Sequence, residues 1–217
     1  MLETLFPSLC VACGDFLDAG GETLCASCIS RIPRFGLCLH NPKLPYTLIA
    51  ATLYGSPEAQ ALIKALKYGG NKRAASTLAL ITAAATRDAL EHEFLTNNDW
   101  RMAPIPLHPK RERERGFNQS VLFAEALQHH EPFRHVPLVS ALQRVRQTET
   151  QTERPDYEAR KKNVANCFEV SDIQSVRGNN ILLVDDVTTS GATLAEATRV
   201  LKSSGARHIT ALVFAKA

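Results

Sequence analysis

The chain has 217 residues, a formal net charge of +3 and 45% hydrophobic residues, so it can bury a sizeable core. Its charge is too small to predict, by itself, a protein that binds nucleic acid or a membrane surface. No segment approaches the roughly 18 consecutive apolar residues of a transmembrane helix, and the first residues lack the basic and apolar regions of a secretion signal. These features predict a cytoplasmic protein without a membrane span.

Two C-x-x-C pairs, separated by 11 residues, open the chain: Cys10, Cys13, Cys25 and Cys28. In a reducing compartment such pairs bind metal more often than they form disulfides. Four thiolates complete a tetrahedral zinc site with no open position, so we predict a structural zinc in a small ribbon domain over residues 1–45. Buried or disulfide-linked thiols are the alternative interpretation.

Two further cysteines stand outside this set. Cys38 and His40 suggest half of a second metal site, but two ligands are too few to build one. A small apolar side chain under a loop is the simpler interpretation of Cys38. Cys167 is predicted to be an ordinary residue of a strand, without a chemical role.

Apolar runs and amphipathic stretches alternate over residues 46–217, which we assign to a second domain. Strands are predicted within 47–55, 100–108, 179–186 and 208–217. Helices are predicted at 56–70, 72–93, 121–130 and 192–205. This alternation predicts an α/β domain in which helices flank a mainly parallel sheet.

A charged segment, PIPLHPKRERERGFNQS, covers residues 104–120. We predict a basic turn, ended by a glycine, at the mouth of the sheet edge, where a pyrophosphate group needs positive charge. The residues assigned to this basic loop are Lys110, Arg111, Arg115 and Gly116. A solvated run of mixed charges is the alternative interpretation. Residues 142–168, which show little apolar periodicity, are predicted to form a long mobile loop or lid.

The sequence ILLVDDVTTSGATL begins at residue 181. Its four apolar residues predict a buried central strand, so Asp185 and Asp186 fall at the carboxyl end of that strand, where open α/β sheets bind ligands. The loop that follows leads into a helix, whose first N–H groups can bind an anion, and Gly191 lets the backbone approach closely. The loop residues are Thr188, Thr189, Ser190, Gly191, Ala192 and Thr193.

Neither G-x-x-x-x-G-K-[ST] nor G-x-G-x-x-G is present. A phosphate cradle directly after two carboxylates suits a phosphorylated sugar, because Asp185 and Asp186 can accept hydrogen bonds from two vicinal hydroxyls and help to hold Mg²⁺. A capped helix is the alternative, but capping explains one hydroxyl rather than four hydroxyls and two acids.

This segment resembles the motif with which type I phosphoribosyltransferases bind 5-phosphoribosyl 1-pyrophosphate (PRPP). The resemblance implies that Asp185 and Asp186 meet the ribose hydroxyls and that residues 189–193 hold the 5-phosphate. The motif indicates the ligand more strongly than the reaction.

Several motifs in one order resemble the ComF family of competence proteins nearly end to end: the cysteine pairs, LIKALKYGG, PIPLH, RGFNQS, QTETQTERPDYEARKKNV and VDDVTTSGATL. The resemblance implies that residues 107–116 bind pyrophosphate and that residues 144–163 close over the site. Many members carry another C-x-x-C pair near residue 38, which is reduced here to Cys38-Leu-His40.

The same resemblance implies a part in natural transformation or DNA use, with contacts to DNA-uptake proteins and imported single-stranded DNA handled in the cytoplasm. Basic and aromatic side chains suit single-stranded DNA or a lid; those assigned to this role are Lys67, Tyr68, Phe117, Arg144, Arg146, Tyr157 and Arg160. The alternative is a catalytically active phosphoribosyltransferase of nucleotide or nucleobase salvage, although the sequence offers no assignable general base.

Overall fold

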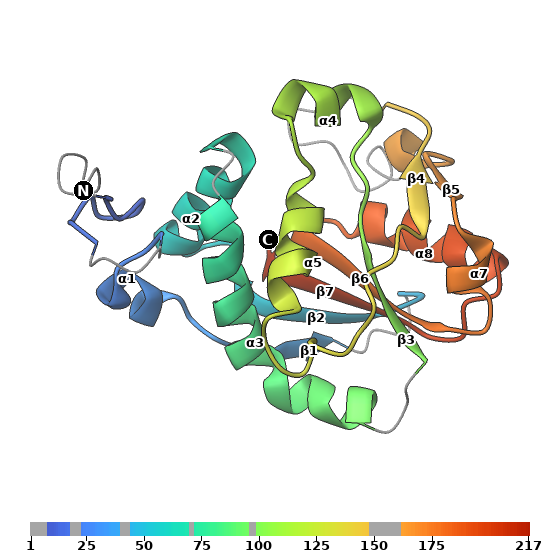
Figure 1. The fold of residues 1–217 in the computed structure, drawn as a ribbon, viewed down its shortest axis with the longest axis horizontal. Helices are drawn as coiled ribbons and strands as arrows, with labels where there is room; N and C mark the ends of the chain where they lie inside the picture. The colour runs from blue at the N-terminus through green and yellow to red at the C-terminus, as the bar shows by residue number, and fades with distance from the viewer. Residues whose placement is uncertain (1–7, 18–22, 40–43, 70–71, 96–98, 148–161) are drawn as a thin grey trace.

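The computed structural model describes residues 8–17, 23–39, 44–69, 72–95, 99–147 and 162–217. Its centre is a five-stranded sheet in the order β1-β2-β7-β6-β3 (Figure 1). The strands are β1 (Leu37–Leu39), β2 (Thr47–Leu53), β3 (Trp100–Pro104), β6 (Asn180–Thr188) and β7 (Ile209–Lys216). β2, β7, β6 and β3 run parallel, and β1 adds an antiparallel edge. The predicted α/β fold with a mainly parallel sheet is therefore confirmed.

Helices cover both faces of this sheet (Figure 1). One face packs against α2 (Pro57–Gly69), α3 (Lys72–Leu95) and α5 (Gln119–Leu127). The other packs against α8 (Ala192–Ser203), the short α7 (Ile173–Val176) and a hairpin of β4 (Leu142–Arg144) and β5 (Phe168–Val170). Two further helices, α1 (Ala26–Arg31) and α4 (Pro109–Arg115), lie at the margins of these layers.

The apolar run of β6 divides its side chains between the two layers. Leu182 and Val184 lie in the core beneath α2, α3 and α5, whereas Ile181 and Leu183 lie in the core beneath α8. Both faces of the strand are buried, which explains why its sequence is continuously apolar instead of alternating. This burial fixes the register that brings the two aspartates near the carboxyl end of the strand, which continues two residues further to Thr188.

The N-terminal segment, blue in Figure 1, packs beside α2 and shares its core. Leu24, Cys28 and Ile32 are buried in the same apolar cluster as Leu62 and Leu66 of α2. The strand β1, which lies before the proposed domain boundary at residue 45, pairs with β2 of the larger domain. The boundary itself remains a proposal.

The basic segment forms a helix, α4, where the sequence predicts a turn. Pro109 occupies the first helical turn, where a backbone N–H has no carbonyl partner within the helix, so the N–H that proline lacks costs no hydrogen bond. Nδ1 of His108 accepts a hydrogen bond from the Lys110 N–H at 3.3 Å. Gly116 ends the helix in the left-handed region, with φ +82°.

Three other segments refine the predictions from sequence. Leu142–Arg144 and Phe168–Val170 pair as β4 and β5, so the expected loop is shorter than 142–168. Residues 148–161 lie outside the described residues, as do Tyr157 and Arg160 within them. Cys167 is buried immediately before β5.

The prediction that Cys38 lies under a loop is wrong. Cys38 is exposed in the edge strand β1, because its backbone pairs with Ile49 of β2 while its side chain faces outward. His40 lies outside the described residues. Within the described part of the chain, none of the helices has the length and apolar character needed to cross a bilayer.

Candidate functional site

Asp185 and Asp186 lie near the carboxyl end of β6, where they are 9% and 2% exposed. Oδ1 of Asp185 accepts hydrogen bonds from the Ser120 hydroxyl and from the Asp186 N–H, both at 2.9 Å. Oδ2 of Asp186 lies 2.7 Å from Nζ of Lys67, in the last turn of α2. The two acids therefore have different partners, a hydroxyl for one and an ammonium group for the other.

The electrostatics of the acid pair follow from this burial. Burial raises the pKa of Asp185 to about 7, and the adjacent charge of Asp186 acts in the same direction. Burial is the largest influence on Lys67 and acts to lower its pKa, but the charge of Asp186, the hydrogen bond to Asp186 and the charge of Asp185 together outweigh burial. The pKa of Lys67 therefore rises and its ammonium group stays charged. The site thus combines two acids, one hydroxyl donor and one buried cation.

The start of α5 positions Ser120. Oδ1 of Asn118, the N-cap residue, accepts a hydrogen bond from the Ser120 N–H at 2.9 Å, and its Nδ2 donates to the carbonyl of Ile105 at 3.0 Å. Asn118 therefore ties the helix to the segment that follows β3. Neither Ser120 nor Asn118 is among the site residues predicted from sequence, although an Asn directly before a helical stretch is a signal of the helix start.

The hydroxyl-rich loop joins β6 to α8 directly above the end of the sheet. Gly191 is the N-cap of α8 and has φ +76°, and its carbonyl accepts a hydrogen bond from the Tyr46 hydroxyl at 3.4 Å. The Ala192 N–H lies 3.4 Å from Oγ of Ser190. Gly191 has no side chain to cap the 12-residue helix, so the first turn of α8 presents backbone N–H groups suited to an anion. Thr188 and Ala192 are buried, Thr189 is exposed, and Ser190 and Thr193 are half-buried.

The basic loop lies on α4 and its C-cap. Lys110 is exposed, and Arg111 and Arg115 are half-buried. Nη1 of Arg115 donates to Oε1 of Gln119 at 2.6 Å, and its guanidinium carbon lies 5.9 Å from the ring centroid of Tyr68. Tyr68 is 81% exposed and is the residue after Lys67, so Arg115 connects α4 to the end of α2 beside the acid pair.

Of the residues assigned from sequence to DNA or a lid, those that the structure describes are not gathered at one place. Lys67 belongs to the acid pair. Arg144 is half-buried, with its guanidinium carbon 5.4 Å from the ring centroid of Phe168, and Phe117 is half-buried near the end of α4. Nη2 of Arg146 donates to the carbonyls of residues 163 and 165, at 2.8 and 2.6 Å, and so links the two sides of the segment between β4 and β5.

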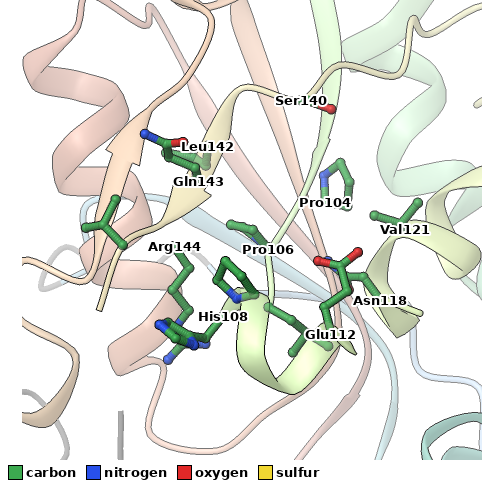
Figure 2. A pocket seen from close by; sticks show the side chains of 13 residues that line it. Pro104, Pro106, His108, Glu112, Asn118, Val121, Ser140, Leu142, Gln143 and Arg144 are labelled. Atoms are coloured by element: carbon green, nitrogen blue, oxygen red, sulfur yellow. The ribbon is translucent and has the colours of Figure 1, made fainter. Parts of the chain in front are cut away.

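A pocket of about 480 Å³ lies between the start of α4, Asn118 and the strand β4. Figure 2 shows Pro104 at the end of β3 and Pro106 just after it, together with His108 and Glu112, along part of the lining. Gln143 and Arg144 of β4 lie along another part. Asn118 also lines it, and Ser120, two residues on, binds Asp185. This pocket could not be predicted from sequence, because its walls come from two separate segments of the chain, within residues 104–121 and 140–145.

The four cysteines of the N-terminal pairs come together. Their Sγ atoms all lie within 4.8 Å of one another, and those of Cys13 and Cys25 are 3.7 Å apart. Zinc–sulfur bonds of about 2.3 Å place tetrahedral thiolates about 3.8 Å apart, so the cluster fits a metal such as zinc. The Cys25 N–H lies 3.4 Å from Sγ of Cys10, and hydrogen bonds of this kind favour thiolates.

An arginine connects this metal cluster to α2. Nη2 of Arg31 donates to Sγ of Cys28 at 2.8 Å, and its Nε lies 2.9 Å from Oε1 of Glu58 in the first turn of α2. Lys67 lies in the last turn of the same helix. One helix is therefore linked to the cysteine cluster through Arg31 at its start and contacts the acid pair through Lys67 at its end.

Comparison with known proteins agrees with this geometry. Residues 118–217 match the phosphoribosyl transferase domain family. The chain is 32% identical over 194 residues to the DNA utilization protein YhgH of Escherichia coli (strain K12), an alignment that covers 87% of this chain and 82% of that protein. It is 38% identical over 104 residues to competence protein ComFC of Bacillus subtilis (strain 168), covering 48% and 39% of the two chains. It is 27% identical over 235 residues to competence protein F of Haemophilus influenzae (strain ATCC 51907 / DSM 11121 / KW20 / Rd), covering 100% of both.

The matched domain begins at Asn118 and contains the acid pair and the loop before α8. The relatives extend the similarity to the N-terminal part of the chain, where the four cysteines cluster. The chain therefore belongs to the ComF family of competence and DNA utilization proteins, which carry a phosphoribosyltransferase-type domain.

Proposed function

We propose that the protein binds PRPP together with Mg²⁺ at the acid pair and the loop before α8. One observation carries this proposal: Asp185 and Asp186 are buried near the carboxyl end of the central strand β6, and the N-cap of α8, which makes no side-chain capping hydrogen bond, follows five residues after Asp186. The carboxylates suit the vicinal hydroxyls of a ribose, and the N–H groups of α8 suit its 5-phosphate. Half-buried Arg111 and Arg115, with exposed Lys110, supply positive charge for the pyrophosphate.

The donor set at the acid pair fits Mg²⁺, which prefers carboxylate oxygens and retains several water ligands. Asp185 and Asp186 would hold the ion, which supplies neutralisation of the pyrophosphate charge when bound. Ser120 orients Asp185 through its hydroxyl, and Gly191 lets the backbone of the loop approach a phosphate. The role of these residues is to bind and orient the ligand.

Calorimetric titration with PRPP and Mg²⁺ tests this proposal. The wild-type protein should bind, whereas Asp185→Asn with Asp186→Asn should lose at least about tenfold in affinity, because two charged acceptors of the hydroxyls and the ion are removed. Glu125→Gln is the matched control, since this acid is exposed on α5. Absence of binding to the wild-type protein would contradict the proposal.

We further propose that the protein acts in competence or DNA utilization, as the names of its relatives state for them, and handles imported single-stranded DNA in the cytoplasm. Exposed Tyr68, with Arg115 near its ring, has the aromatic and basic character of a single-strand platform. Exposed Lys110 and Arg113 extend positive charge along α4. Contacts with proteins of the DNA-uptake machinery belong to the same proposal.

Filter binding of a labelled oligothymidine over a salt series tests the DNA proposal. Tyr68→Ala should weaken binding by about 1–3 kcal/mol, the contribution of one stacked base. Replacing Lys110 or Arg113 by alanine should reduce the salt slope by about one unit for each side chain that neutralises a phosphate. Phe35→Ala, at another exposed aromatic residue, should leave binding unchanged. No affinity at low salt would refute this part.

The pocket beside α4 favours a second candidate, a catalysed phosphoribosyl transfer. Its volume of about 480 Å³ falls within the range of about 300–1,000 Å³ for small-molecule sites. A nitrogen of a bound base would form a bond to C1 of the ribose while the bond from C1 to the pyrophosphate oxygen breaks, and the nitrogen would lose its proton to water. Pyrophosphate release that depends on a base and disappears in Asp185→Asn with Asp186→Asn would establish this activity. Binding of PRPP without release for any base of a panel would leave the protein as a sensor.

We propose that the metal at the four cysteines is zinc with a structural role. Cys10, Cys13, Cys25 and Cys28 supply four thiolate ligands, which leaves no position for a substrate. Metal analysis of the purified protein should give about one zinc per chain.

A further inference from the structure

Lys67 holds a position at the acid pair that a metal ion would need. Its ammonium nitrogen lies 2.7 Å from Oδ2 of Asp186, and the two side chains are 27% and 3% exposed. The contact is therefore a nearly buried ion pair between α2 and β6 and not a surface salt bridge. The role of a single lysine at this place is not explained by ribose or phosphate binding at β6 and α8.

A buried carboxylate requires a compensating group, and Lys67 supplies it. Asp185 has the Ser120 hydroxyl as its donor, whereas the carboxylate of Asp186 has the ammonium group of Lys67. Removing one partner from such a pair leaves an uncompensated charge in a region of low dielectric constant. Lys67 thus places a positive charge beside Asp186 before any ligand arrives.

The same oxygen of Asp186 cannot be held closely by Lys67 and by a divalent cation. Two positive groups within a few ångströms of each other in a buried site repel strongly. Arg115, whose charge already acts to lower the pKa of Lys67, makes a third positive group nearby. An ion that binds Asp186 must therefore displace the ammonium group, which a flexible four-carbon side chain allows.

We propose that Lys67 is a built-in counter-ion of the acid pair: it occupies the cation position at Asp186 in the free protein, yields that position to the metal, and then pairs with a phosphate oxygen of the incoming sugar phosphate. This inference rests on the proposed binding of a metal and a ribose phosphate at the acid pair. It makes Lys67 a positioning residue that disfavours binding of the metal alone and favours binding of the metal with its ligand.

The two effects have opposite signs, so one variant tests both. In Lys67→Met, Mn²⁺ alone, measured by the electron paramagnetic resonance signal of free Mn²⁺, should bind tighter by about tenfold or more, because a competing positive charge is removed. PRPP in the presence of Mg²⁺, measured by calorimetry, should bind weaker by about tenfold or more, because a charged phosphate partner is lost. Lys67→Arg should keep the weak binding of Mn²⁺ alone.

Lys64→Met is the matched control, because Lys64 is an exposed lysine one turn earlier on α2. It should change neither affinity. A merely structural role for Lys67 would weaken both affinities together, and that outcome overturns the inference, as does unchanged binding of Mn²⁺ in Lys67→Met. Circular dichroism melts establish that each variant is folded, and Lys67→Gln, which keeps a polar end, replaces Lys67→Met if the latter does not fold.

The Mn²⁺ and PRPP titrations also separate this inference from the proposed function. Mn²⁺ binding is measured without any sugar phosphate, so tighter binding in Lys67→Met supports the counter-ion role whether or not PRPP is the natural ligand. If the wild-type protein binds PRPP and Mg²⁺ but Lys67→Met binds Mn²⁺ no more tightly, the inference alone fails. If the wild-type protein does not bind PRPP at all, the proposed function fails.

Discussion

Gly191 closes the loop between β6 and α8 beneath the hydroxyl of Tyr46. Its φ of +76° lies in the left-handed region, and a Cβ atom there would be 2.7 Å from that hydroxyl oxygen. Gly191→Ala should therefore lower the free energy of unfolding by about 1–2 kcal/mol for the backbone conformation, with a further loss for the clash. Urea denaturation measures the change in the free energy of unfolding. The variant should also bind PRPP more weakly in a calorimetric titration, because the added methyl group displaces the loop before α8.

Gly178→Ala is the control for Gly191→Ala, because Gly178 has the same φ of +76° but open space around its Cβ position. The difference between the two variants isolates the contact with Tyr46. Adding Tyr46→Phe to Gly191→Ala removes the hydroxyl oxygen and should recover the part of the loss due to the clash. Equal losses in both glycine variants would show that Tyr46 does not constrain the loop.

Asp185 makes stability depend on pH in a direction opposite to that of a carboxylate whose pKa is lowered in the folded protein, such as Glu58. Burial raises its pKa in the folded protein to about 7, from an ordinary value of 3.8. The folded state therefore binds a proton more tightly than the unfolded state, so the contribution of Asp185 to stability is present below about pH 4 and is lost as the pH rises to about 7. The measurement compares the free energy of unfolding of the wild-type protein with that of Asp185→Asn in metal-free buffer. The difference, wild type minus variant, should fall between about pH 4 and pH 7 and stay constant at higher pH. A difference that increases with pH would mean that the folded protein favours the ionised acid.

The acids and the hydroxyl-rich loop could be predicted from sequence because they are contiguous along one strand and one helix start. Lys67 and Ser120 could not be assigned to the same site, since they reach it from helices that follow β2 and β3. The sequence shows Lys67 only as a cation beside an aromatic residue, which also suits DNA. Its distance of 2.7 Å from Asp186 depends on the order of strands in the sheet.

At the scale of elements, α2 links the cysteine cluster to the acid pair. Arg31 joins Cys28 to Glu58 at the start of the helix, and Lys67 binds Asp186 at its end. Removing the metal with a chelator in reducing buffer should loosen α1 and the start of α2, because structural zinc sites stabilise the fold that surrounds them. Hydrogen exchange followed by mass spectrometry should show faster exchange in these two helices.

The helix α8 is the internal control for this experiment, since it packs on the opposite face of the sheet. Its exchange should be little changed by chelation, and re-addition of zinc should restore the slow exchange of α2. Unchanged exchange in α2 after complete metal removal would contradict the link.

The long helices and central strands could be predicted because each shows several periods of its apolar pattern. The short elements could not. The three-residue strands β4 and β5 span too few residues for an alternation to be visible, and their pairing joins Leu142 to Val170 across the chain. The seven residues of α4 are polar on every side, so the helix is signalled only by Pro109 at its start and Gly116 at its end.

At the scale of the whole molecule, the N-terminal unit and the larger domain share one core. Leu24 and Ile32 are buried with residues of α2 and α3, and β1 covers the edge of β2. A chain of residues 46–217 alone should therefore lose several kcal/mol of its free energy of unfolding, since each fully buried aliphatic side chain contributes about 1.5–3 kcal/mol. Urea denaturation of this chain and of the full sequence measures the difference.

Full-length chains carrying Leu24→Ala or Ile32→Ala serve as controls for that truncation. Each should lose part of the same free energy without exposing the edge of β2. A chain of residues 46–217 with the stability of the full sequence would show that the two units fold independently.

The position of β7 in the sheet sets an order of events during synthesis. β7 lies between β2 and β6, although it follows both in the chain. During synthesis, β7 is therefore the last strand of the sheet to leave the ribosome, as residues 209–216. Until then β2, which precedes Lys67, and β6, which carries the aspartates, are not connected within one sheet. Pairing between Thr47 and Thr210 spans most of the chain, and contacts so distant in sequence form late and slowly. Chains that lack β7 therefore lack the assembled site of Lys67 and the two aspartates. We expect them not to bind the sugar phosphate until β7 has joined β2 to β6.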